Sequence, residues 1–217
     1  MERLAAVDWF SIVAALCFWL ALPWAQSLDR GFPVWLRKSA VPCLALWLVA
    51  WNFSAGPGPG LALAAAPAIL WACWLWAFGL RRFFADDLAP PPRRCLEMLA
   101  ATGPLVAAVA WVWSRHDRTF AGFPDPLATL TTVHFAIAFG VLPLAMAASE
   151  RPLARSRRRD YGMWLYVLAA PATALGFALR VDPFRPGAAE VACAALFAAG
   201  FLLWASGMPD RRNPWPF

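Results

Sequence analysis

The run LATLTTVHFAIAFGVLPLAMAA, residues 127–148, decides the fold class of this chain, because it contains no Asp, Glu, Lys or Arg over its whole length. A helix needs about 20 such residues to cross a hydrocarbon layer of roughly 30 Å. The run therefore predicts a transmembrane helix. Asp125 and Pro126, directly before it, suit the N-cap and the first helical position and predict where the helix begins.

His134 is the titratable side chain inside this run. It lies about nine residues, or roughly 13 Å, into the predicted helix and thus near the middle of a bilayer. An ionisable group at that depth is costly, which makes His134 a candidate functional residue. α-Helical spacing places Thr131 and Ala138 on the same face. The alternative is a neutral imidazole that hydrogen-bonds to a neighbouring helix and contributes about 1 kcal/mol to packing.

Most of the chain follows the same pattern of apolar runs bounded by charges, Pro or Gly. Of the 217 residues, 61% are hydrophobic and 15% are charged, whereas a soluble domain is about half apolar and a quarter charged. We expect an all-α fold, a polytopic integral membrane bundle of about seven transmembrane helices, with six as the fallback because one run is short and contains Pro42. The further runs are residues 7–25, 39–53, 61–80, 96–113, 161–179 and 188–206.

The connections between these runs are short, at most about fifteen residues, so consecutive helices are expected to be antiparallel neighbours. We therefore expect a single transmembrane domain over residues 1–217. One connection, residues 88–92, ends in three successive prolines. Because each proline removes an amide donor and fixes φ, we expect this connection to be non-helical.

The net charge of +6 is distributed unevenly between alternate connections. Fourteen of the 19 Lys and Arg residues fall on one side of the predicted bundle and five on the other. Basic residues in short loops mark the cytoplasmic side. The sequence thus predicts a multi-pass protein of the inner (plasma) membrane, with its N-terminus outside and its C-terminus in the cytoplasm. The basic character indicates topology, and no nucleic-acid partner is expected.

The densest basic segment follows the run that contains His134. We expect its arginines to contact anionic lipid headgroups, each contributing about 1 kcal/mol near the membrane surface. The simpler alternative is a stop signal that only orients the two flanking helices. The arginines concerned are Arg155, Arg157, Arg158 and Arg159.

Three further polar residues complete a candidate polar cavity with His134 and Thr131. Thr173 lies six residues, roughly 9 Å, below the outer end of its run, within about one turn of His134 in depth. Asp8 and Glu190 lie in the first turns of their predicted helices. There a carboxylate either faces the cavity or is simply favoured by the helix dipole.

The five cysteines show no C-x-x-C spacing and no Cys/His spacing typical of a metal site. Thiols inside apolar runs behave as small apolar side chains. We therefore expect no catalytic residue set, no cofactor and no metal.

The segment around His134 resembles the signature of the YndJ-like family of bacterial polytopic membrane proteins, with the match centred on residues 111–145. Where members of that family typically continue His-Phe-His-Tyr-Ala-Gly, this chain lacks the second histidine and the tyrosine, so a site with two imidazoles is not implied. The resemblance implies a membrane protein that is sometimes labelled a transporter. The matching residues are Trp113, Ser114, Arg115, Gly122, Phe123, Asp125, Pro126, Leu130, Thr131, Val133, His134, Phe135, Ala138, Leu142, Pro143 and Leu144.

Three functions fit these observations. The first is a small permease or carrier of a small or lipophilic molecule, with His134 as a proton or hydrogen-bonding site. The second is a non-catalytic membrane partner subunit that binds lipid, pigment or another protein. The third is an intramembrane enzyme acting on an isoprenoid or lipid, in which tryptophans stabilise positive charge and Asp8 or Glu190 is the acid. We favour the first; the absence of a deep carboxylate counts against an enzyme.

Overall fold

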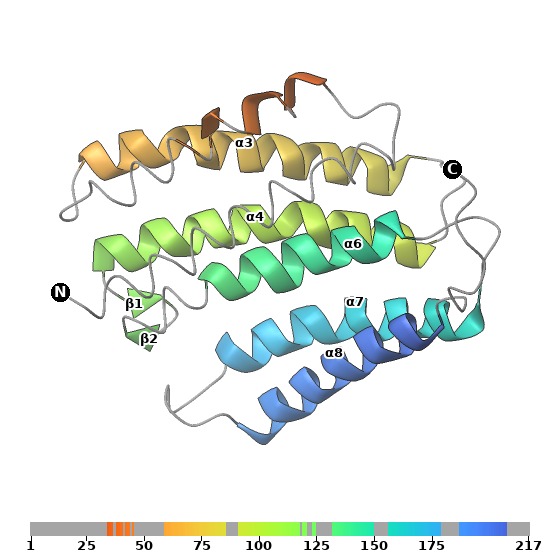
Figure 1. Cartoon of the computed structure of the whole chain (residues 1–217). Helices are drawn as coiled ribbons and strands as arrows, with labels where there is room; N and C mark the ends of the chain where they lie inside the picture. Colours follow the sequence, from red (N-terminus) through yellow and green to blue (C-terminus); the bar gives the residue numbers. More distant parts are fainter. Residues whose placement is uncertain are drawn as a thin grey trace. The chain divides into compact units, whose positions relative to one another are not determined.

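The computed structural model describes the helical regions of the chain and confirms the all-α class for them (Figure 1). Among the described residues, strand pairing is confined to a two-residue hairpin, β1 (Thr119–Phe120) antiparallel to β2 (Phe123–Pro124). The predicted run 7–25 and the predicted helix start at Asp125 lie outside the described part. The described residues are 34–36, 38–40, 42–43, 45, 59–85, 91–117, 119–120, 123–124, 132–149, 156–178 and 187–207.

The longer helices agree closely with the predicted apolar runs. α8 has the predicted bounds, and α3 and α4 extend beyond theirs. α4 begins inside the proline-rich connection, so the expectation that residues 88–92 are non-helical was wrong for the last two prolines. The first turn of a helix needs no amide donors, and the fixed φ of proline suits it. The helices are α3 (Pro59–Phe84), α4 (Pro91–Asp117), the π-helix η1 (Phe135–Val141), α6 (Leu142–Ala148), α7 (Arg157–Ala178) and α8 (Ala188–Ser206).

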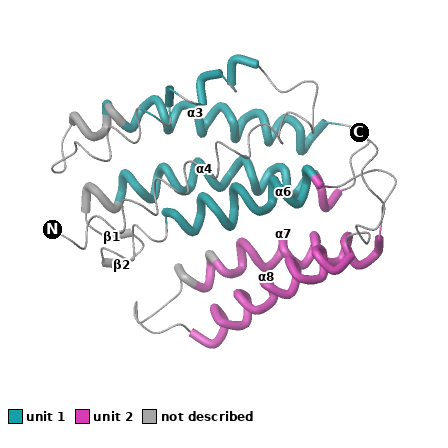
Figure 2. The backbone as a smooth tube through the Cα atoms, in the orientation of Figure 1, with its two compact units in different colours: residues 1–89, 94–148 teal, residues 90–93, 149–217 magenta. Residues whose placement is uncertain are grey.

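The chain divides into two compact units (Figure 2). Unit 1 comprises residues 1–89 and 94–148, and it contains α3, most of α4, η1 and α6. Unit 2 comprises residues 90–93 and 149–217, and it contains α7 and α8. The single transmembrane domain expected from the sequence stays a prediction.

Two of the described helices are long and apolar enough to cross a membrane, Pro91–Trp113 within α4 and the whole of α8. Residues Thr132–Ala148, which include η1 and α6, form a shorter apolar helix. The two long helices differ in packing, since 44% of the most apolar window is buried in α4 and only 17% in α8. The number of seven spans stays a prediction.

In unit 1, a buried apolar cluster joins Leu36 and Ala40 to α3 and α4. The indole nitrogen of Trp71 donates a hydrogen bond to the Leu36 carbonyl oxygen at 2.8 Å. Leu36 and Ala40 are almost fully buried in this cluster. Within the described part of the chain, residues 34–36 are already helical, before the start of the predicted run 39–53.

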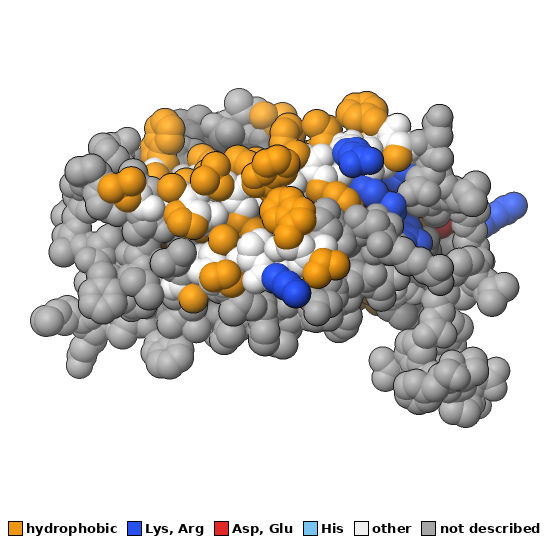
Figure 3. All heavy atoms as spheres, turned by 90° about the horizontal axis from the view of Figure 1, so that it is seen from above, with side chains coloured by type: hydrophobic (Ala, Val, Ile, Leu, Met, Phe, Trp, Pro, Cys, Tyr) orange, Lys and Arg blue, Asp and Glu red, His pale blue; other side chains and the backbone are white. Residues whose placement is uncertain are grey.

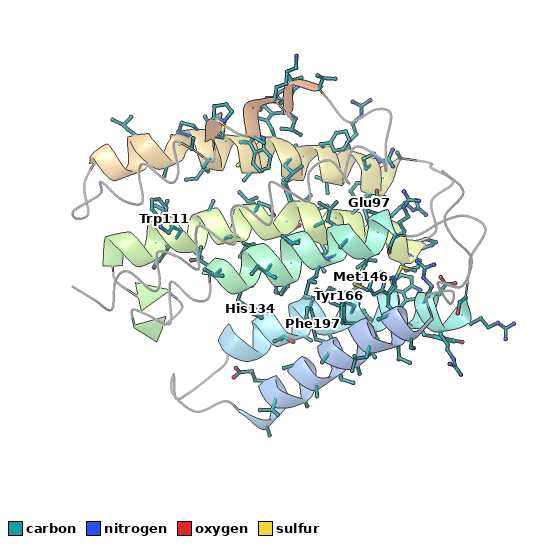
Figure 4. The ribbon with its side chains drawn as sticks, viewed as in Figure 1. Glu97, Trp111, His134, Met146, Tyr166 and Phe197 are labelled. Atoms are coloured by element: carbon teal, nitrogen blue, oxygen red, sulfur yellow. The ribbon has the colours of Figure 1, made fainter. Side chains whose placement is uncertain are left out.

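Charged side chains link the end of α3 to the start of α4. Arg82 Nη2 lies 3.7 Å from Glu97 Oε2, which joins the end of α3 to the start of α4. Glu97 and Trp111 lie toward opposite ends of α4 (Figure 4). On the face drawn in Figure 3, hydrophobic side chains cover much of the described surface, and Lys and Arg side chains lie mostly toward one end.

In unit 2, α7 and α8 form an antiparallel hairpin with direct backbone contact. A Cβ atom added at Gly200 would lie 2.7 Å from Tyr166 N and 3.0 Å from Gly162 O. The Tyr166 and Phe197 rings lie between the two helices, with centroids 4.1 Å apart (Figure 4). Small residues at such a crossing let two helices approach closely.

Candidate functional site

His134 lies at the N-terminal side of the π-helix η1, on an apolar helix that carries no other titratable group (Figure 4). Its side chain is exposed. The imidazole centroid lies 6.2 Å from the Phe135 ring and 6.4 Å from the Phe139 ring. The two phenyl rings are themselves 5.0 Å apart. The site is therefore an imidazole beside two aromatic rings of its own helix.

The π-helix ends two residues before a proline, Pro143, whose properties suit a wider turn. Pro143 has no amide hydrogen, and its ring would clash with the carbonyl group four residues earlier, at Phe139, in a regular α-helix. Directly before it, the Leu142 N–H donates to the Ile137 carbonyl oxygen, five residues back. Such wider turns are rare and occur frequently at functional sites.

The wider turn changes the face on which the sequence placed His134. Ala138, expected on that face, is buried at 4% exposure, whereas His134 is exposed. Phe139, five residues along, is the residue whose ring meets the imidazole. The α-helical spacing used for this face does not hold within η1, and Thr131 lies outside the described residues.

η1 packs against α4 through a glycine. A Cβ atom at Gly103 would lie 2.5 Å from Gly140 N and 2.5 Å from Phe139 C, both backbone atoms. A small cluster of Ala107, Val133 and Ala136 continues this contact. No side chain larger than hydrogen fits at Gly103, so the two backbones touch there.

Thr173 and Glu190 both lie in unit 2, on the two helices of the α7–α8 hairpin. Both are buried, at 7% and 6% exposure. The Thr173 hydroxyl donates to the Ala169 carbonyl oxygen at 2.8 Å, a bond within its own helix. Glu190 lies in the first turn of α8, and its Cα would be 3.3 Å from a Cβ atom added at Gly176.

The described residues of the predicted cavity belong to two different units. Thr173 is three residues, or roughly one turn, from the Gly176–Glu190 contact. His134 belongs to the other unit. Asp8 lies outside the described residues, so the joint cavity stays a prediction.

The position of Arg159 differs from the one that a contact with lipid headgroups requires. Its side chain is buried at 1% exposure, and Nη2 donates to the Ser149 carbonyl oxygen at 3.0 Å. Its Cγ lies 2.6 Å from the position of a Cβ atom at Gly207. Arg157 and Arg158 are exposed, as a headgroup contact requires, and Arg155 lies outside the described residues.

A sequence signal for the burial of Arg159 existed. At α-helical spacing, Arg159 shares a face with Gly162 and Tyr166, three and seven residues further on. Both of these residues are buried against α8. Of the described arginines in this basic segment, Arg159 is therefore buried in the hairpin, whereas Arg157 and Arg158 are exposed. Glycine contacts such as Gly103 with Gly140 carried no comparable signal, because each depends on a partner far along the chain.

Among the residues that the structure describes, no group of three or more His, Cys, Asp or Glu side chains is arranged to hold a metal ion. A family model described as "YndJ-like protein" matches residues 11–216 of the chain. That range is far wider than residues 111–145, on which the resemblance in the sequence was centred. No curated protein and no solved structure matches the chain.

Proposed function

The chain belongs to the YndJ-like family, and on that premise we propose that it is a multi-pass protein of the inner (plasma) membrane. We propose further that it carries a small or lipophilic molecule past a polar site at His134. The observation that carries this proposal is the position of His134, exposed within the uncharged helix Thr132–Ala148.

α8 supports the membrane part of the proposal. It is apolar on all sides, and its charged residue, Glu190, lies in the first turn. Val191, Leu196 and Leu202 are each about half exposed or more, at 53%, 49% and 64%. A helix that is hydrophobic all round belongs in a buried core or in a membrane, and little of α8 is buried.

The chemistry of imidazole supports the carrier part. A neutral imidazole both donates and accepts a hydrogen bond, and it takes up a proton near physiological pH when it is not perturbed. Beside Phe135 and Phe139 it presents one polar group in an aromatic, apolar surrounding. Such a surface suits a mostly apolar molecule with one polar end.

The two histidines of the chain allow a matched test of this site. Wild-type protein, His134→Ala and His116→Ala are purified in detergent, and their organic extracts are compared by mass spectrometry. We expect a small molecule that co-purifies with the wild type and with His116→Ala but is lost from His134→Ala. In a deletion strain, His134→Ala should fail to complement any uptake or export phenotype that the wild type restores. Full complementation by His134→Ala would remove the carrier proposal.

The membrane topology has its own test. A green fluorescent protein fused after Phe217 should fluoresce, because the C-terminus is proposed to be cytoplasmic. Alkaline phosphatase inserted in residues 54–60 should be active, because that connection is proposed to be outside. The membrane fraction should retain the chain after an alkaline carbonate wash; release into the soluble fraction would contradict membrane insertion.

A second function, a non-catalytic partner subunit, is favoured by the exposed apolar surface of α7. Leu168 and Leu175 are 64% and 59% exposed there. A partner helix of similar composition would cover them. Co-purification of one stoichiometric membrane protein in mild detergent would favour this function, whereas a monodisperse chain without partners would count against it.

A further inference from the structure

The π-helix η1 changes which residue neighbours His134. In an α-helix, five residues turn through about 500°, which places residue i+5 about 140° away around the axis. In η1, hydrogen bonding between residues five apart brings such pairs onto neighbouring positions of successive turns. The Phe139 ring accordingly meets the His134 imidazole with an interplanar angle of 70°. Without the wider turn, Phe139 would face away from His134.

Gly103 on α4 contacts the backbone that carries the Phe139 ring. The two nearest atoms to a Cβ at Gly103 are Phe139 C and Gly140 N, which are the two ends of one peptide bond. The third, Gly140 Cα at 2.8 Å, also belongs to the backbone. A side chain at position 103 would therefore have to displace this peptide bond, since no flexible group could turn away.

Burial differs across the two ring partners. Phe139 is buried at 7% exposure, whereas His134 is exposed. The phenyl ring beside the imidazole therefore belongs to the buried part of unit 1.

We infer that Gly103 and η1 position His134: the backbone contact at Gly103 fixes the Phe139–Gly140 peptide bond, and the Phe139 ring then fixes the imidazole. The consequence for activity rests on the function proposed above, because it requires that His134 contacts the carried molecule. The positioning itself is a property of unit 1 and can be measured without any transport assay.

The chain contains two histidines, so nuclear magnetic resonance of histidine-labelled full-length protein in lipid discs gives two imidazole signals. His116 is the internal reference. Phe139→Leu should displace the His134 signal by removing the ring current of a neighbouring aromatic ring, and Phe139→Tyr should restore it. Gly103→Ala should displace the His134 signal as well, while the His116 signal stays in place.

Gly79 provides a matched control, because it lies where α3 contacts α4. A Cβ atom at Gly79 would lie 2.6 Å from Ala101 Cβ, two residues from Gly103, without touching η1. Gly79→Ala should therefore strain α4 but leave the His134 signal unchanged. Gly187→Ala, with nothing within 4 Å of the added Cβ, should change neither signal.

Two results would overturn the inference. An unchanged His134 signal in Phe139→Leu would mean that no aromatic ring of residue 139 lies beside the imidazole. An equal displacement in Gly79→Ala and Gly103→Ala would mean general loosening of unit 1. If Gly103→Ala fails to fold, the His134 signals of Phe139→Leu and Phe139→Tyr still show whether the ring of residue 139 positions the imidazole. If the signals behave as expected but His134→Ala keeps full activity, the proposed function fails and the positioning stands.

Discussion

The α7–α8 hairpin and the α4–η1 contact both bring two backbones together at glycine, but they handle polar groups in opposite ways. The hairpin joins two regular α-helices and buries Arg159, Thr173 and Glu190. The α4–η1 contact joins an α-helix to a π-helix and leaves His134 exposed. Close backbone contact by itself thus determines neither the type of helix nor whether polar side chains are buried. Where polar groups are enclosed we expect a structural role, and where one is displayed we expect a binding role.

Gly162→Ala should have the largest effect on stability and tests the hairpin side of the comparison. The added Cβ would meet Trp204 N and, at 2.7 Å, Gly200 O, both backbone atoms of a regular helix. Overpacking of this kind costs about 3 kcal/mol when the neighbours cannot move. Denaturant unfolding of the purified protein, followed by tryptophan fluorescence, measures the loss. A cost as small as that of Gly187→Ala would show that the two helices are not in backbone contact.

Arg159→Ala should have the next largest effect and sharpens the claim that the hairpin encloses its polar groups. Removal of the guanidinium leaves the Ser149 carbonyl without that donor, and hydrogen bonds to charged groups contribute about 2 kcal/mol. Arg158→Ala is the matched control, because Arg158 is exposed and its loss should leave unfolding unchanged. Equal effects of the two substitutions would place Arg159 at the surface with its neighbours.

Gly103→Ala should lower the free energy of unfolding by about 1 kcal/mol, less than Gly162→Ala, although the added Cβ would lie as close to backbone atoms. The reason is the difference between the two regions: the Phe139–Gly140 peptide bond belongs to a π-helix, which can shift without breaking a regular α-helical hydrogen-bond pattern, whereas the backbone of α8 that meets Gly162 is a regular α-helix. The same unfolding measurement applies. If both variants lose the same free energy of unfolding, the two helix contacts do not differ in rigidity.

The sequence predicts the helices of both regions well, for one physical reason. Each helix follows a long apolar run, and charged residues lie near most of the helix ends. α8 matches its predicted run, and α7 begins four residues before its own. His134 is equally visible, because it interrupts an apolar run with an imidazole.

The surroundings of His134 could not be predicted. In η1 hydrogen bonds join residues five apart instead of four, and this moves Phe139 from the far side of the helix to the side of the imidazole. Local helix propensities do not distinguish an α-turn from a π-turn before Pro143. The supporting glycine, Gly103, lies more than thirty residues earlier in the sequence, and only the tertiary contact identifies it. For Arg159, the sequence indicates the buried face of the helix, but it does not indicate that Gly207 is the neighbour of this side chain.

Thr173→Val should have the smallest effect, about 0.5 kcal/mol, and it separates a structural from a binding role at the buried end of the comparison. The hydroxyl donates to the Ala169 carbonyl oxygen of its own helix, and such back-bonding adds little stability. Thr173→Ser keeps the bond and is the matched control for the valine variant. If Thr173 is a structural residue, Thr173→Val should retain the co-purifying molecule that His134→Ala loses. Loss of that molecule in Thr173→Val but not in Thr173→Ser would assign the enclosed hydroxyl to the same site as the displayed imidazole, and the division between the two regions would no longer hold.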